Sequence, residues 1–344
     1  MHRHLKSCLD KRGKREETNK YNKRSWWIHR EEEADTDELD VKIFRALMSD
    51  RSVAQSDTQF RSSLRTIASR FGADDTTVRN RYKRLQESGA MSGWKLMVNP
   101  TFFACRMGEI MVDVESESAK ADMIRKLKLV DGVIMLMNFY GKSMWIMFVY
   151  NSDESYSRTV ELISRITNAE TMTKARMNLP RSETERLTET DVAIIRALSD
   201  DARKSYTLVA KELGLSPKTV KKRVDGLRRE NTIFTFPSLN IGRVRGLIPV
   251  SLSYVYSNKE AKSLVDREVL SHFEGSYLWG GFSDPNRGFL MLSAPTMADI
   301  QDFLEWAKSQ PGIASARADI PLEQFSFPEK LIERLELRDK VVSR

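Results

Sequence analysis

The chain has 344 residues with 56 Lys and Arg against 48 Asp and Glu, which gives a formal net charge of +8 and a pI of about 9.3. This basic excess suits a polyanionic partner, and the length accommodates roughly two to four domains. With only Cys8 and Cys105, the chain has neither a disulfide framework nor a CxxC site, and we predict no metal and no cofactor. The longest apolar run, residues 144–150, is too short to cross a bilayer and no secretory signal opens the chain, so we expect a cytoplasmic protein without membrane contact.

Residues 1–35 are expected to form a flexible basic tail. They are polar, lack hydrophobic periodicity, and carry ten Lys or Arg against six acids in residues 1–34. Disorder without a function is a simpler interpretation than an arm that contacts phosphates. His2 and His4 lack a third ligand at useful spacing, so this pair predicts no metal site.

Residues 36–98 predict a first helix-turn-helix domain. Asp40 opens a short amphipathic helix, a second follows around Ile67, and Asp74 is a good N-cap for a third. We expect the third helix to offer polar and basic side chains to a nucleic-acid groove: Thr76, Thr77, Arg79, Asn80, Arg81, Lys83 and Arg84. The acidic cap lies where a phosphate would approach, so weaker DNA binding is expected here than in the second copy described below.

Residues 99–180 alternate strand and helix patterns in the order βαββαβ, the ferredoxin-like arrangement. Strands are expected at 107–115, 133–139, 144–150 and 171–178, and helices at 119–129 and after Asp153. In the strand 144–150 both alternating sets of side chains are apolar. Helices of such a unit cover one face of the sheet only, so the other face requires a partner.

Residues 181–238 carry the clearest motif of the chain. Thr188 and Asp191 form an N-cap pair, Gly214 ends a second helix, and Ser216-Pro217 opens a third. Val220, Val224 and Leu227 would form the buried stripe of this third helix. Its other faces carry the predicted DNA contacts, which are Lys218, Thr219, Lys221, Lys222, Arg223 and Arg228.

The stretch GLSPKTVKKRVDGLRRENTI resembles the DNA-binding region of the Lrp/AsnC (feast/famine) transcription regulators. In that family a helix-turn-helix precedes a ferredoxin-like effector domain. The resemblance implies an α+β fold, double-stranded DNA as the partner, and an effector such as an amino acid.

Residues 239–326 repeat the βαββαβ order, so the chain reads as two tandem units, each a winged or three-helix helix-turn-helix followed by a ferredoxin-like domain. Strands are expected at 248–256, 276–282, 287–293 and 313–320, and helices at 259–273 and 297–309. Residues 327–344 would form a tail or a helix. The unpartnered sheet faces predict a pseudo-dimer within one chain, with higher homo-oligomers left open.

A weaker prediction concerns an effector site in the turn of the second unit. Gly280, Gly281, Ser283 and Asp284 lie where family members bind amino acids between paired domains. Any tight hairpin also uses such residues, because glycine adopts positive φ.

Two other functions remain open from the sequence. Sirohaem and haem-precursor decarboxylases resemble the same tandem architecture, but their substrate sites use histidine in the sheet hairpins, and the two hairpins here contain none. No nucleophile with a base is evident either, and we predict no enzymatic activity and no catalytic residue. An architectural DNA- or RNA-binding protein would use the same basic helices without choosing a sequence.

Overall fold

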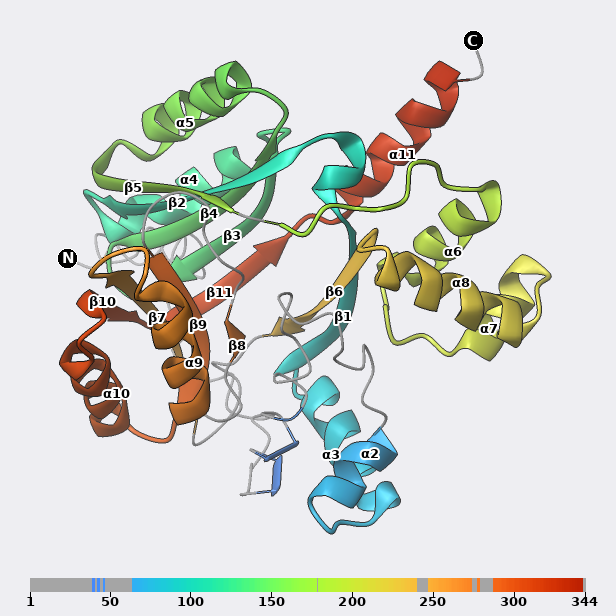
Figure 1. The fold of residues 1–344 in the computed structure, drawn as a ribbon, viewed down its shortest axis with the longest axis horizontal. Coiled ribbons are helices and arrows are strands. Elements are labelled where there is room, and N and C mark those ends of the chain that lie inside the picture. The colour runs from blue at the N-terminus through green and yellow to red at the C-terminus, as the bar shows by residue number, and fades with distance from the viewer. Residues whose placement is uncertain are drawn as a thin grey trace, which may run out of the picture.

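The computed structural model describes residues 39–40, 42–43, 46, 64–177, 179–239, 247–273, 277–278 and 287–342. Two helix-turn-helix units flank a two-stranded ribbon, and two antiparallel sheets with helices on their outer faces lie beside it (Figure 1). The fold class is therefore α+β with two tandem units, as the sequence predicted. Among the described residues no helix has the length and hydropathy needed to span a bilayer.

The second helix-turn-helix consists of α6 (Glu189–Ser199), α7 (Tyr206–Leu213) and α8 (Pro217–Arg229). Thr188 and Asp191 form the predicted capping box of α6, and the Ser216 hydroxyl accepts from the Thr219 N–H at the start of α8. Gly214 ends α7 with a φ of 66°, a left-handed conformation that glycine adopts without steric cost. Local sequence signals and the observed helix ends agree throughout this unit.

The first helix-turn-helix is described in part, through α2 (Leu64–Arg70), α3 (Asp75–Glu87) and a few residues of the preceding helix. The Asp74 carboxylate accepts from the N–H groups of Thr76 and Thr77, so an aspartate replaces the serine that caps α8. These backbone hydrogen bonds lower the pKa of Asp74. The cap is therefore a charged group at the tip of this motif.

Strands β1 (Met91–Val98) and β6 (Ile233–Leu239) follow the two helix-turn-helix units and pair with each other in an antiparallel ribbon. The strand after each unit thus pairs with its counterpart in the other copy. Beside it, the Asn99 side chain is fully buried and donates to the carbonyls of Pro180 and Asn231, at 2.8 and 2.7 Å. Backbone hydrogen bonds and this amide therefore both connect the two copies at the ribbon.

The first sheet contains β2 (Arg106–Val114), β3 (Val133–Phe139), β4 (Ser143–Tyr150) and β5 (Ala169–Met177). Their order, β3-β4-β2-β5, is that of a ferredoxin-like unit. Helices α4 (Lys120–Lys128) and α5 (Asp153–Thr167) cover one face. The N-cap of α5 is Ser152, one residue before the start that the sequence predicted, because the Ser152 hydroxyl accepts the Ser155 N–H in a capping box.

The second sheet contains β7 (Ile248–Tyr256), β8 (Tyr277–Leu278), β9 (Arg287–Ala294) and β10 (Ile313–Asp319) in the order β10-β7-β9-β8. Helices α9 (Lys262–His272) and α10 (Met297–Ser309) pack on its outer face (Figure 1). Both predicted βαββαβ units are therefore present, with element ends within a few residues of those expected, apart from the described part of β8.

The two sheets pack on each other through the faces that their helices leave open. The sequence left open which of the two alternating sets of side chains on each sheet faces the other sheet. In the structure it is the set that contains Trp145 and Phe289. Their rings stack with centroids 5.8 Å apart and planes inclined by 9°. Ile146 and Phe148, the alternative set on β4, pack under the helices of their own unit.

After β10 the chain leaves the second sheet and adds β11 (Pro321–Ser326) to the edge of the first, beside β3. Helix α11 (Glu329–Val342) then packs against β1 and α6. The Lys330 ammonium donates to the carbonyls of Lys128 and Val130 at the end of α4, at 2.9 and 2.8 Å. The C-terminal segment therefore contacts the first sheet and the second helix-turn-helix, although the sequence placed residues up to 326 in the second ferredoxin-like domain.

Candidate nucleic-acid interface

Helix α8 carries the best candidate contacts to DNA. Lys218 and Lys222 are exposed, while Val220, Val224 and Leu227 are buried against α6 and α7, as the periodicity predicts. Lys221 is also exposed but forms an ion pair with Asp225 four residues later, which raises its pKa. Within the described ranges no ion pair engages Lys218 or Lys222, so both ammonium groups are available to phosphates.

Three of the predicted contact residues pair with an acid on the first helix of their own motif. Arg223 donates to both carboxylate oxygens of Asp191 on α6, at 3.4 Å. In the first copy Arg81 and Arg84 pair with Asp40, whose side chain is fully buried. The same link between the first and third helices occurs in both repeats, so these arginines hold the motif together. Their role in contacting DNA stays a prediction.

The remaining contact residues differ between the two third helices. On α3, Arg79 pairs with Asp75 and Lys83 pairs with Glu87. Thr76, Thr77 and Asn80 are exposed. On α8, Thr219 is half-buried and its hydroxyl lies 2.8 Å from that of Ser216, while Arg228 is half-buried near the helix end.

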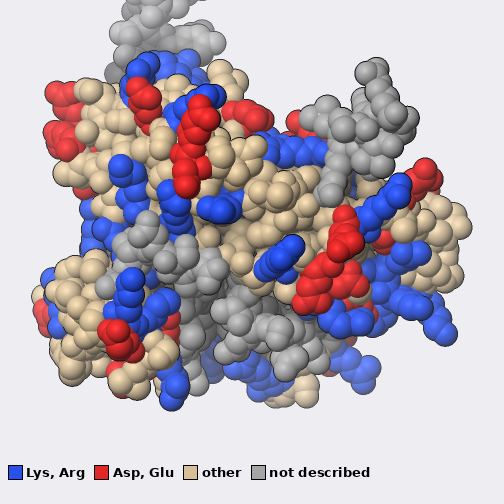
Figure 2. Space-filling model, turned by 45° about the horizontal axis from the view of Figure 1, so that its top comes forward, with Lys and Arg blue, Asp and Glu red and all other residues tan. Residues whose placement is uncertain are grey.

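The pairing of basic side chains with acids therefore differs between α3 and α8. On α3 both Arg79 and Lys83 pair with an acid one turn away, whereas on α8 two lysines have no acidic partner among the residues that the structure describes. Over the face drawn in Figure 2, Lys and Arg are interspersed with Asp and Glu. Unpaired lysines are the better partners for phosphates, and that α8 binds a polyanion more strongly than α3 stays a prediction.

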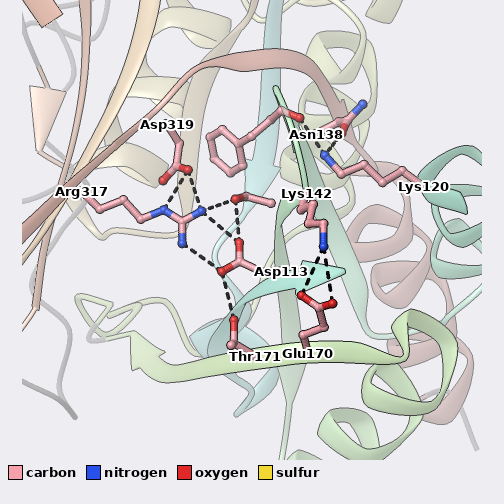
Figure 3. A network of polar contacts seen from close by, with 10 residues as sticks. Asp113, Lys120, Asn138, Lys142, Glu170, Thr171, Arg317 and Asp319 are labelled. Carbon is pink, nitrogen blue, oxygen red and sulfur yellow. Dashed lines mark hydrogen bonds and ion pairs between the residues drawn. The ribbon is translucent and has the colours of Figure 1, made fainter. Parts of the chain in front are cut away.

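A polar network that the sequence did not predict joins the two sheets at one edge (Figure 3). Arg317 on β10 donates to both oxygens of Asp113 on β2, at 2.9 and 3.1 Å, and also pairs with Asp319. The Ser143 hydroxyl donates to Asp113 at 2.7 Å. These hydrogen bonds hold the pKa of Asp113 near 2. No local signal could reveal this pair, since its two members lie 204 residues apart.

The predicted effector residues Gly280, Gly281, Ser283 and Asp284 lie outside the described residues, so that site stays a prediction. Within the described ranges no group of three His, Cys, Asp or Glu side chains is placed to hold a metal ion. His272, at the end of α9, stacks on the Trp306 ring with centroids 3.9 Å apart.

Comparison with known proteins identifies the second helix-turn-helix. Residues 187–228 match the AsnC-type helix-turn-helix domain. The chain is also 30% identical over 106 residues to the HTH-type transcriptional regulator Ptr1 of Methanocaldococcus jannaschii. This alignment covers 31% of the chain and 66% of that regulator, so the chain spans a little under two thirds of the relative's length.

Solved structures of similar arrangement include the siroheme decarboxylase NirDL, with a TM-score of 0.49 at 13% identity, covering 89% of this chain and 100% of that one. The AsnC structure from E. coli gives a TM-score of 0.30 at 19% identity and covers 44% of this chain and 97% of that one. The match of the family model, and not these structures, confirms the family that the sequence motif indicated there: residues 187–228 are a helix-turn-helix domain of the AsnC type.

Proposed function

We propose that this protein is a sequence-specific DNA-binding transcription regulator of the Lrp/AsnC type. The observation that carries the proposal is the AsnC-type domain at residues 187–228, whose third helix has a buried apolar stripe and two exposed lysines with no acidic partner in the described part of the chain. A helix of this kind enters the major groove with its N-terminal residues toward the bases. Lys218 and Lys222 would contact phosphates or base edges there.

The test replaces Lys218 and Lys222 with Ala together and measures binding to genomic DNA fragments at several salt concentrations. We expect weaker binding, and a log–log salt slope smaller by about 0.9 for each phosphate that the variant no longer neutralises. The matched control replaces Lys174 and Lys308, two exposed lysines on β5 and α10 that, like the α8 pair, form no ion pair within the described residues. Equal losses of DNA affinity in both double variants would show that only the net charge of the protein matters, and would contradict the assignment of α8 as the DNA contact.

The structure also guides a test of the first motif. Replacing Arg79 and Lys83 on α3 should weaken binding less than the α8 double variant, because both side chains already pair with neighbouring acids. These positions are better probes than Arg81 and Arg223, whose replacement would also remove the links to Asp40 and Asp191. A loss from α3 as large as that from α8 would contradict the predicted order.

The β1–β6 ribbon supports a composite operator with two half-sites. Paired strands connect the two helix-turn-helix units, so one chain presents two recognition helices, as a dimer of single-unit regulators would. The two third helices differ in sequence, and we therefore expect unlike half-sites and a non-palindromic operator. Footprinting on co-purified DNA fragments tests this: discrete protected sites support a regulator, and uniform coating would indicate an architectural protein.

A small-molecule effector and a pseudo-dimeric state belong to the same proposal. The packed sheet faces, with Trp145 stacked on Phe289, support pairing within the chain. Mass measurement by light scattering should then give a single chain at micromolar concentration, and larger species would show that outer faces also associate. Incubation with sirohaem tests the alternative that the protein is a sirohaem decarboxylase. A Soret band retained on the purified protein would support that alternative.

A further inference from the structure

The C-terminal helix α11 lies beside α6, where the first sheet meets the second helix-turn-helix (Figure 1). It packs against α6 and also against β1, the strand that follows the first helix-turn-helix. Residues 88–90 alone connect α3 to β1, so this strand continues almost directly from the first recognition helix. One helix therefore contacts α6 of the second motif and the strand that leaves the first.

The apolar face of α11 makes this contact. Leu331 and Leu335 lie one turn apart with exposed fractions of 0% and 2%, and Ile332 beside them is also buried. All three belong to the same buried cluster as Ile195 of α6 and Leu96 of β1. Because protein cores are close-packed, a contact of this kind defines where α6 lies relative to β1.

Lys330 attaches α11 to the first sheet. Its ammonium donates to the backbone carbonyls of Lys128, Val130 and Val133, at 2.9, 2.8 and 2.9 Å. An ammonium has three donors, so these hydrogen bonds use all of them. The first two carbonyls lie at the C-terminal end of α4, where the helix dipole favours a cation. Lys330 is thus committed to the first unit and is not a candidate contact with DNA.

Arg334 provides a second attachment one turn further along α11. Its guanidinium donates to the Asp131 carboxylate, in the turn between α4 and β3, and to the Cys105 thiol sulfur, both at 3.4 Å. Residues four apart share one face of a helix, so Lys330 and Arg334 reach the first unit together. Polar contacts therefore hold α11 on the first unit, and apolar contacts hold α6 and β1 on α11.

We propose that Lys330 is a positioning residue for DNA recognition, which keeps the second helix-turn-helix at a set distance from the first so that the protein selects the spacing between its two half-sites. This inference rests on the proposed function and deepens it. In paired helix-turn-helix proteins, the separation of the recognition helices sets the spacing of the half-sites. Lys330 acts on that separation through α11 and α6.

Selection from a library of random-sequence DNA duplexes tests the proposal with the full chain. We expect the unaltered protein to enrich two half-sites at one spacing. Lys330→Met keeps a long apolar side chain and removes the ammonium, so this variant should enrich the same half-sites at several spacings. Lys330→Arg, which retains a charged donor, should restore the single spacing. Lys308→Met, at an exposed lysine on α10, should leave the spacing unchanged.

A distance measurement without DNA gives a second readout. Spin labels are attached to Lys126→Cys on α4 and Lys222→Cys on α8, both exposed positions, in a Cys8→Ser chain whose remaining Cys105 is buried. We expect a narrow distribution of label distances with Lys330 and a broader one with Lys330→Met. If Lys330→Met does not fold, Arg334→Gln removes the second attachment alone and should broaden both distributions in the same way.

The outcomes separate this proposal from the proposed function. A folded variant that keeps a single half-site spacing, or an unchanged distribution of label distances, would overturn the role of Lys330 and leave the regulator assignment intact. An unaltered chain that enriches no sequence would overturn the regulator assignment and this proposal with it. Half-sites whose sequences themselves change in Lys330→Met would show that Lys330 affects base recognition and would also contradict a role in spacing.

Discussion

At the scale of single residues, two carboxylates on β2 show how environment sets chemistry. Glu109 and Asp113 lie four residues apart on one strand and therefore on the same face of the sheet. Asp113 meets Arg317 and stays ionised, with its pKa held near 2. Burial raises the pKa of Glu109 to about 8, and this effect outweighs the hydrogen bond from the Trp145 indole and the charge of Arg287, which both act to lower it. The sequence places both acids on one face of the strand, but only the second sheet decides which of them forms a hydrogen-bonded ion pair with an arginine.

Replacing Glu109 with Gln should alter how stability depends on pH. The pKa of Glu109 is raised on folding from 4.5 to about 8, so the folded chain keeps a proton that the unfolded chain releases. Its contribution to stability is fully present below about pH 4.5 and is lost as the pH rises through 8, with a slope of up to about 1.4 kcal/mol per pH unit. We expect Glu109→Gln to gain stability relative to the parent between pH 5 and about 8. Urea unfolding of both proteins across this range measures the difference, and parallel curves would contradict the assignment.

At the scale of elements, the helix-turn-helix units depend on a link between their first and third helices. Asp191 serves twice, since it completes the capping box at the start of α6 and accepts from Arg223 on α8. Asp40 pairs with Arg81 and Arg84 in the first copy. A basic residue on a recognition helix is thus not automatically a DNA contact, because an ion pair within the domain can already engage its charge.

Asp191→Ala should therefore destabilise the second helix-turn-helix by about 1–3 kcal/mol, because it removes the Asp191 half of the capping box and the ion-pair partner of Arg223. Lys222→Ala, at an exposed position on α8, should change stability by less than about 0.5 kcal/mol while weakening DNA binding. Chemical unfolding followed by circular dichroism gives both values. A Lys222→Ala protein as unstable as Asp191→Ala would show that Lys222 has a structural role.

At the scale of the whole molecule, the second unit completes the first in three places. β6 pairs with β1, β11 extends the first sheet, and α11 packs against β1 and α6. The two sheets also bury Trp145 against Phe289. Separately expressed halves would lack these contacts, so mutations in the intact chain are the cleaner way to test the arrangement.

A double-mutant cycle on Trp145 and Phe289 tests the packing of the sheets. Each single change to Ala should cost about 3–5 kcal/mol, because it leaves a large buried cavity. The two effects should couple by about 0.5–1.5 kcal/mol, since the removed rings contact each other. Strict additivity in chemical unfolding would mean that the rings do not meet in solution.

The sequence by itself determined the elements and their order. The caps at Thr188, Ser216 and Asp74 act through hydrogen bonds within three residues, and the apolar stripe of α8 follows from helical period alone. The internal repeat and the two βαββαβ units could also be predicted from the sequence, because the hydrophobic periods of strands and helices differ. The identity of the second helix-turn-helix also lay within one short local stretch.

Tertiary structure decided what depends on residues far apart in the chain. The face of β4 that meets the other sheet was ambiguous, since both sets of its side chains are apolar and only packing chooses Trp145 over Ile146. The transfer of β11 to the first sheet, and the pairs that Asp113 and Asp191 make with arginines, likewise join distant segments. The position of α11 against β1 and α6 depends on segments from both repeats, so no pattern within either repeat could predict it.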